Sequence, residues 1–249
     1  MTITSQHNRK LKEVRKLRQR RRWRERSGRF VAEGEDLLAA ADAAGWQAIE
    51  RYSVSGSGLA GTEVDADLLA AASGLASGTR TLAVYEERWA PAATGPLCVY
   101  LHGVRDPGNV GAVLRSAEAF GAASVVLGPE CADPFGSKAV RASMGAVFAV
   151  PLVRGAGLAS LPGVKIALVP GQGVPLAEAL GCGSTPPNQM PTVLADVTLL
   201  VGAEREGLPD AIAAQADTTA HIPIQTDSLN AAMAATIGLY ELRSRMAPR

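Results

Sequence analysis

The sequence predicts an α/β protein with a small N-terminal domain and a larger C-terminal domain built on a mostly parallel sheet. In the C-terminal part, apolar runs rich in β-branched residues alternate with helical patterns, as they do in βαβ units. A stretch of linker composition, Ala90–Pro96, separates these runs from an earlier and shorter α/β pattern. We therefore place the domains at residues 1–90 and 97–249.

The first 90 residues predict a small α/β unit that begins with a basic helix. Gly28 interrupts this helix, and turn-forming residues separate the elements that follow. The expected helices are Leu11–Trp23, Glu35–Ala44 and Asp65–Ala72, the expected strands are Arg29–Gly34, Trp46–Val54 and Thr81–Tyr85, and Ser55–Gly61 is expected to be a loop.

The net charge of +1 conceals a strong asymmetry along the chain. From Arg9 to Arg29 there are 12 Lys or Arg residues and two acidic ones, whereas the remainder has 13 basic and 22 acidic residues. A solvated basic helix would explain this segment taken alone. A phosphate-binding arm would also explain why an otherwise acidic protein carries it, and nucleic acid is the partner that such an arm favours.

Beyond the linker, six apolar runs predict the strands of the second domain. Helical patterns follow most of them, whereas Gly181–Leu194 has no periodicity and is expected to be a surface loop. The expected strands are Leu97–Leu101, Ser124–Leu127, Val147–Val153, Lys165–Val169, Val197–Val201 and His221–Ile224, and the main helices are Val110–Phe120, Ala211–Ala216 and Leu229–Met246.

The composition argues against several classes of protein. Hydrophobic residues make up 47% of the chain, yet no apolar run reaches the length of about 18 residues that a membrane span needs. The basic N-terminus has no apolar signal core. Cys98, Cys131 and Cys182 are odd in number and, like the three histidines, lack metal-ligand spacing. We expect a cytoplasmic protein with no membrane segment and no metal site.

Three short blocks follow strand ends in the second domain, where parallel α/β proteins place their ligands. The first is Asn109–Arg115, which comes after a turn-rich loop. Asn109 is a good helix N-cap, Gly111 permits close approach of the backbone, and Arg115 is expected a turn and a half inside the helix. An ordinary capped helix with an exposed arginine would also explain this block on its own.

The second block is Gly202–Leu208, directly after the buried strand Val197–Val201. Two glycines, Gly202 and Gly207, bracket Glu204. A carboxylate at this place could bind a ligand or orient a partner arginine. The alternative is a simple connection from strand to helix.

The third block combines Ile222–Ile224 with Ser228–Asn230. Ser228 is a suitable helix cap, and Asn230 is expected in the first turn of the long final helix. This helix has an apolar face, so a purely structural packing role is the alternative. A competing pattern, Gly155–Ser160, resembles a dinucleotide fingerprint but lacks its last glycine and its acidic partner.

The order and spacing of these blocks resemble the three signature motifs of the SpoU/TrmH family of RNA ribose 2′-O-methyltransferases. The motifs are Asn-x-Gly-x-x-x-Arg, Gly-x-Glu-x-x-Gly-Leu, and Ile-Pro-Ile followed by Ser-Leu-Asn, and the match covers Leu97–Arg245. The segment Arg29–Gly34 is similar to the family's small substrate-binding domain, which has an L30e-like fold. The three motifs in order are far more specific than any one of them.

The resemblance implies a SPOUT fold with a deep trefoil knot in the C-terminal domain, a homodimer, and S-adenosyl-L-methionine bound at the knot. It implies that Arg115 is the catalytic arginine and that the other polar motif residues position Arg115 and the ribose. These positioning residues are Asn109, Glu204, Ser228 and Asn230; the implied cofactor-binding residues are Val169, Val201, Gly202, Ile222 and Leu229.

The resemblance also implies an RNA substrate, with 23S ribosomal RNA favoured over transfer RNA. Some members of the family confer resistance to antibiotics that bind the ribosome. A guanidinium holds its proton strongly, so we expect Arg115 to hold a phosphate and stabilise alkoxide charge rather than act as a base. The alternatives are an inactive RNA-binding homologue or, if the Gly155 pattern matters, a nucleotide-dependent oxidoreductase.

Overall fold

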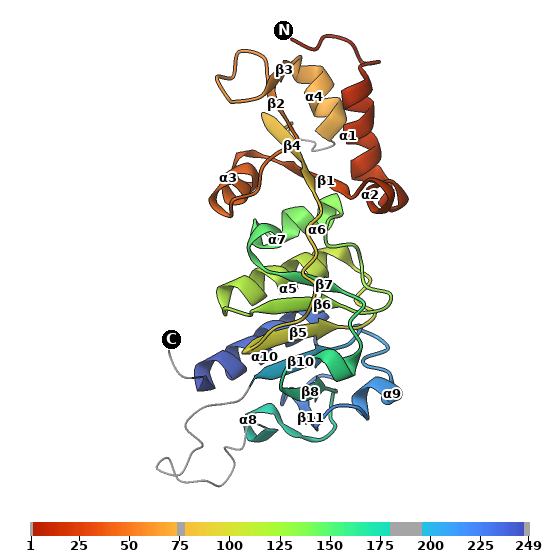
Figure 1. The fold of residues 1–249 in the computed structure, drawn as a ribbon. Helices are drawn as coiled ribbons and strands as arrows, with labels where there is room; N and C mark the ends of the chain where they lie inside the picture. Colours follow the sequence, from red (N-terminus) through yellow and green to blue (C-terminus); the bar gives the residue numbers. More distant parts are fainter. Residues whose placement is uncertain (1, 74–77, 180–195, 247–249) are drawn as a thin grey trace.

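The computed structural model describes residues 2–73, 78–179 and 196–246, and these residues form two sheets. The N-terminal sheet has four strands in the order β1-β4-β2-β3, and the C-terminal sheet has seven in the order β7-β6-β5-β10-β8-β11-β9. Figure 1 shows the small domain stacked on α6 and α7 of the large one. The α/β class and the expectation of a mostly parallel second sheet are confirmed.

The small domain packs helices around its four strands. β4 (Thr81–Glu86) is antiparallel to both β1 (Arg29–Glu33) and β2 (Glu50–Val54), while β3 (Thr62–Val64) runs parallel to β2. The predicted strand from Trp46 begins too early, since β2 starts at Glu50. The Trp46 side chain points to the large domain and donates from Nε1 to the Phe148 carbonyl oxygen at 2.8 Å. The helices are α1 (Arg9–Gln19), α2 (Arg21–Ser27), α3 (Glu35–Ala43) and α4 (Ala66–Ser73).

The predicted basic helix is two helices, not one. Arg20 has an extended backbone with φ −122° and ψ 105°, so α1 ends and α2 starts in a new direction. α1 buries Leu11, Val14 and Leu17 completely in the core of the small domain. The basic segment is therefore an integral part of that domain and not a loose arm.

A buried ion pair joins α2 to the large domain. Arg24 and Asp133 have side chains only 7% and 6% exposed, and two guanidinium nitrogens each lie 2.7 Å from Asp133 Oδ2. Arg24 Nη1 also donates to the Leu17 carbonyl oxygen at 2.6 Å. Breaking such a pair leaves a buried charge without its partner, which costs about 3–5 kcal/mol. This contact fixes α2 beside the loop after β6.

All strand pairs of the large domain are parallel among the residues that the structure describes. β5 pairs with β10 in full register from Leu97↔Val197 to Leu101↔Val201. The strands are β5 (Leu97–Leu101), β6 (Ser124–Leu127), β7 (Leu152–Arg154), β8 (Val164–Leu168), β9 (Val174–Pro175), β10 (Val197–Val201) and β11 (Thr218–His221). The helices are α5 (Pro107–Ala119), α6 (Ser137–Ala142), α7 (Ala146–Ala149), η1 (Leu158–Ser160), α8 (Leu176–Ala179), α9 (Asp210–Ala213) and α10 (Ala231–Arg245).

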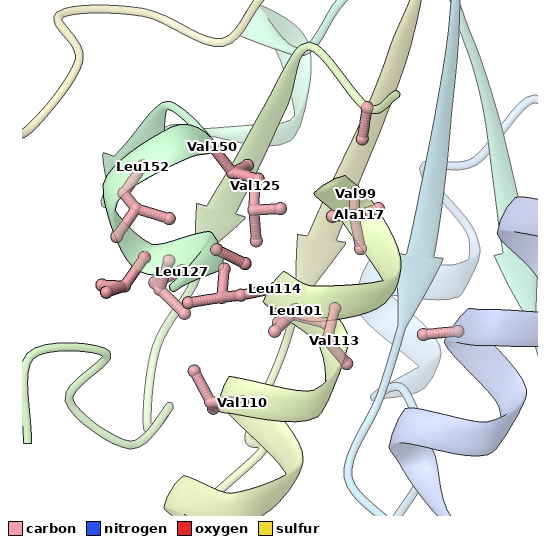
Figure 2. Close-up of a cluster of buried hydrophobic side chains, with 14 of the residues drawn as sticks. Val99, Leu101, Val110, Val113, Leu114, Ala117, Val125, Leu127, Val150 and Leu152 are labelled. Atoms are coloured by element: carbon pink, nitrogen blue, oxygen red, sulfur yellow. The ribbon is translucent and has the colours of Figure 1, made fainter. Parts of the chain in front are cut away.

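The core between α5 and the sheet fixes the helix that carries the first motif. Val110, Val113 and Leu114 are fully buried against strand residues such as Val99 and Leu101 (Figure 2). The fully buried apolar side chains contribute about 1.5–3 kcal/mol each relative to exposure. α5 is therefore held firmly over the carboxyl end of β5.

Two of the predicted strands do not lie where the sequence patterns place them. Val147–Val153 splits into α7 and β7, because Pro151 separates the two and Phe148 packs against aromatic rings of the small domain. The strand expected at His221–Ile224 is β11, three residues earlier, since Thr218–Ala220 form the parallel ladder with β8. The sequence patterns missed β3, β9, α6 and α8, while the predicted loop Gly181–Leu194 lies outside the described residues.

No helix in the described parts of the chain is long and apolar enough to cross a membrane.

Candidate functional site

The first motif enters the site at the start of α5. Its N-cap is Asp106, whose carboxylate accepts from the Asn109 backbone nitrogen at 3.0 Å, so the expectation that Asn109 is the cap is wrong. Pro107 fixes the first helical φ, and α5 therefore begins earlier than predicted. Lys138 Nζ lies 2.7 Å from Asp106 Oδ2, and this ammonium lowers the pKa of the Asp106 carboxyl. The side chain of Asn109 is thus available for the site.

The three motifs meet at one carboxylate, that of Glu204. Asn109 Nδ2 donates to Glu204 Oε1, and Asn230 Nδ2 donates to the same oxygen at 2.6 Å. Asn230 Nδ2 also lies 3.1 Å from Asn109 Oδ1. These residues are 95 and 26 positions away from Glu204 in the sequence, yet they form one cluster.

Asn230 is the N-cap of α10, and the expectation that Ser228 caps this helix is wrong. Asn230 Oδ1 accepts from the backbone nitrogens of Ala232 at 2.9 Å and Met233 at 3.3 Å. Its two polar atoms therefore have separate roles, since the oxygen caps the start of α10 and the nitrogen donates to Glu204. Ser228 lies just before this cap, with an exposed side chain at the edge of the neighbouring pocket.

A mostly apolar pocket lies beside this cluster at the ends of β8, β10 and β11. It holds about 520 Å³ of space free of protein atoms, its open mouth included. All five residues expected to bind the cofactor line it, namely Val169, Val201, Gly202, Ile222 and Leu229. Glu204 and Ser228 add polar groups to the same lining. An apolar lining with a few polar groups is typical of a small-molecule site.

Gly202 permits the tight loop that presents Glu204. A Cβ added to Gly202 would lie 2.1 Å from the Gly207 carbonyl carbon, so no other residue fits without opening the loop. The backbones of Ala203 and Gly207 form an isolated antiparallel bridge that closes this loop. Gly202 is thus explained by the close approach of the Gly207 backbone, and Gly207 by its own φ of +67°.

Arg115 stands apart from the cluster. It is exposed on α5, and within the described parts of the chain its side chain has no hydrogen bond or ion pair. It is the ninth residue of α5, more than two turns from the start, so the expected position of a turn and a half is wrong. The next residue, Ser116, bonds to Thr236 of α10 at 2.6 Å, which places Arg115 beside the α5–α10 packing.

A group of charges around the outer side of the site was not predicted from the sequence. Arg105 pairs with Glu130 after β6 and, at 3.4 Å, with Glu206 of the second motif. The guanidinium of Arg105 lowers the pKa of the Glu130 carboxyl through a hydrogen bond. All three side chains are more than half exposed, so water and salt screen both pairs and neither adds much to stability. Only proximity in the fold reveals them, because they come from three separate loops.

The fold and the site together define a protein of the SPOUT methyltransferase class. The chain superposes on an S-adenosyl-methionine-bound rRNA methyltransferase from Sinorhizobium meliloti with a TM-score of 0.84 and 28% identity, covering 100% of this chain and 99% of that one. The cofactor complex of the SpoU methyltransferase AviRb from Streptomyces viridochromogenes gives a TM-score of 0.80 at 26% identity, covering 98% and 100%.

The chain belongs to the SpoU rRNA methylase family, since residues 96–240 match that family. Residues 8–88 match the MRM3-like substrate binding domain. Over 153 residues the chain is 34% identical to the 23S rRNA (guanosine(2553)-2'-O)-methyltransferase RlmP of Bacillus subtilis, covering 61% of this chain and 59% of that protein. Over 158 residues it is 34% identical to the 23S rRNA (uridine(2479)-2'-O)-methyltransferase of Streptomyces viridochromogenes, covering 57% and 51%. The aligned part thus spans little more than half the length of these curated relatives.

Proposed function

We propose that this protein transfers a methyl group from S-adenosyl-L-methionine to a ribose 2′-hydroxyl of ribosomal RNA, most simply 23S RNA. The observation that carries the proposal is the Asn109–Glu204–Asn230 cluster at the rim of the apolar pocket. Both compared relatives are named as 23S rRNA 2′-O-methyltransferases, and two similar structures were solved with the cofactor. A cytoplasmic site of action follows from such a substrate.

The pocket residues fit S-adenosyl-L-methionine. Apolar side chains such as Ile222 and Leu229 suit an adenine ring, and Val169 and Val201 extend this apolar lining at the strand ends. Glu204 and Ser228 supply polar groups for the rest of the ligand. A trefoil knot around this pocket and an L30e-like fold of the small domain are predictions that belong to this proposal.

In the proposed mechanism the bound cofactor supplies an electrophilic methyl group, and the chain positions the nucleophile. Asn109 and Asn230 fix the Glu204 carboxylate, which then presents an acceptor for a ribose hydroxyl. Arg115, an exposed cation with no partner in the described structure, binds the neighbouring phosphate and stabilises charge that develops on the 2′-oxygen. Water or that phosphate takes the proton.

We further propose that the protein works as a homodimer with α10 at the interface. One side of α10 carries three large apolar side chains that are well exposed, namely Met233 (61%), Ile237 (40%) and Tyr240 (60%). A cluster of exposed apolar side chains is typical of a protein–protein interface. The Tyr240 ring contacts Phe120 at the end of α5, the helix that bears Arg115. Pairing through this stripe would bring Arg115 next to the second copy.

Two measurements test the proposed function. Calorimetric titration should show one S-adenosyl-L-methionine site per chain. Incubation of the protein and cofactor with deproteinised 23S ribosomal RNA and, separately, with transfer RNA should give one new 2′-O-methyl group in the ribosomal RNA, located by reverse-transcription stops at low nucleotide concentration. Cofactor binding with no methylation of either RNA would favour the inactive RNA-binding alternative.

A further inference from the structure

A second hollow lies at the ends of β6 and β7 and shares no lining residue with the cofactor pocket. It includes about 1050 Å³ of space with its open mouth. Its lining includes Arg21 of α2, Trp89 just before the linker, and the loops that follow β6 and β7. We call it the α2–β7 groove. None of the motifs assigned to methyl transfer reaches it.

Arg154 is the prominent cation of this groove. Its guanidinium carbon lies 4.1 Å above the ring of Trp89, and no carboxylate of the described residues lies within ion-pair distance of it. Trp89 is itself held, because its Nε1 donates to Glu87 Oε2 at 3.1 Å and its ring meets Phe135 edge-on at 5.2 Å. A guanidinium stacked in this way loses little further freedom when it binds an anion or a flat ring.

The lining also carries Arg21, whose Nη1 donates to the Cys131 carbonyl oxygen at 3.3 Å and which pairs with Glu25. The acidic residues of the lining, Glu130 and Asp133, are already paired with Arg105 and Arg24. Glu25 and Glu87 also interact electrostatically with Arg154, but Glu25 pairs with Arg21 and Glu87 accepts from Trp89, and neither forms an ion pair with Arg154. Arg154 is therefore the cation in this groove that can bind a ligand, and the ligand it favours is an anion.

The glycine pattern that follows β7 lines the groove. Gly155 has a φ of +68°, which favours glycine, and a Cβ at Gly155 or Gly157 would meet nothing within 4 Å, so the space beside this backbone is open. The pattern is followed only by the three-residue η1 rather than by a long helix, which removes the usual basis of dinucleotide binding. Apolar side chains, Tyr100 and Pro129 among them, complete a lining that suits a base beside a phosphate.

We propose that the α2–β7 groove binds a single-stranded nucleotide of the substrate RNA outside the methylated position, with its base or phosphate on the free face of Arg154. The inference rests on the proposed function and names a substrate contact outside the catalytic cluster. RNA is favoured because the mouth adjoins α2, whose Arg22 and Arg26 are exposed. Flat guanidinium and aromatic faces are the surfaces on which unpaired bases stack.

The first test compares Arg154→Ala with Arg88→Ala, a matched control. Arg88 stacks on Trp46 at 4.3 Å, nearly the same geometry, but outside the groove. Arg154→Ala should weaken binding of a fluorescein-labelled oligouridine and raise the KM for 23S RNA by about 10-fold, within the range for loss of one stacked base. The affinity for S-adenosyl-L-methionine should stay unchanged in both variants. Equal losses in the two variants, or none in Arg154→Ala, would overturn the proposal.

Two further variants separate the effect of the Trp89 ring under Arg154 from the effect of the Arg154 charge. Trp89→Phe retains a ring under Arg154 and should bind oligouridine nearly as well as wild type, whereas Arg154→Glu should bind worse than Arg154→Ala. If NADH binds wild type but not Arg154→Ala, and RNA binding is the same in both, the groove is a dinucleotide site instead. If the wild-type protein methylates RNA and Arg154→Ala does so at the normal rate, only this inference is wrong. If the wild-type protein binds no cofactor, the proposed function is wrong.

Discussion

Asn230 donates a 2.6 Å hydrogen bond to the Glu204 carboxylate with the same side chain whose oxygen caps α10. The start of the last helix and the position of the site carboxylate are thus set by one residue. A change at Asn230 that preserves the cap can therefore remove the contact with Glu204 while leaving the fold intact.

Asn230→Asp makes this separation. Aspartate caps helices about as well as asparagine, so we expect α10 to keep its start, while repulsion from Glu204 lowers the free energy of unfolding at neutral pH. Two carboxylates would then face each other, and methylation at neutral pH should fall by about 100-fold. Because the pair would share one proton at lower pH, the rate relative to wild type should recover as the solution is acidified. Rates and urea denaturation measured from pH 5 to 8 test this.

Asn230→Ala is the control for the cap. It removes the acceptor for Ala232 and Met233 and should cost about 1 kcal/mol of stability. The activity of Asn230→Ala relative to wild type should not recover on acidification, unlike that of Asn230→Asp. Identical pH profiles for the two variants would contradict the role given to the Asn230–Glu204 contact.

Arg115→Ala tests the assigned catalytic arginine. Since Arg115 is exposed and has no partner in the described structure, its loss should leave the fold and the affinity for S-adenosyl-L-methionine unchanged. Methylation should fall by at least about 100-fold because the charge on the 2′-oxygen is no longer stabilised. Arg115→Lys should recover part of the rate, as it retains charge but not the two-pronged geometry. Near-normal turnover of the alanine variant would remove Arg115 from the mechanism.

Much of the large domain could be predicted because buried parallel strands are continuous apolar runs. β5, β6 and β10 have the predicted limits, and the pocket lining contains every residue proposed for the cofactor. Helix ends were less predictable, since Asn109 and Ser228 have the chemistry of caps but Asp106 and Asn230 do the capping. Which residue becomes the cap depends on where the preceding loop places the backbone at the start of the helix. The local sequence pattern does not contain that information.

Contacts between the domains could not be predicted at all. Arg24 reads as one of many solvated cations in a basic run, yet it is 5% exposed and paired with Asp133 more than a hundred residues away. Val147 and Phe148 have the composition of a strand, but packing under the small domain makes them helical. In each case tertiary contact outweighs local preference.

The exposed cations of α1 and α2 are expected to bind RNA phosphates. Replacing Lys12, Arg22 and Arg26 by glutamine should weaken RNA binding equally for all sequences and reduce the slope of log affinity against log salt by about one for each phosphate that is no longer bound. Fluorescence anisotropy at several salt concentrations measures both effects. Deleting residues 1–29 is no substitute, because it removes Leu11, Val14 and Leu17 from the core. An unchanged salt slope in the triple variant would exclude these helices from RNA binding.

Glu33 gives the protein a pH dependence of stability with a definite sign. Burial raises the pKa of its carboxyl from 4.5 to about 6, although Arg18 Nε lies 2.9 Å away and opposes the shift. A carboxyl whose pKa is higher in the folded state stabilises the fold below pH 4.5, and this contribution is lost as the pH rises through 6. Glu33→Gln removes the titration, so wild type should gain up to about 2 kcal/mol relative to the variant between pH 7 and pH 4.5. Urea unfolding of both proteins across this range measures the difference. A wild-type stability that instead falls relative to Glu33→Gln on acidification would mean that the Arg18 ion pair outweighs burial.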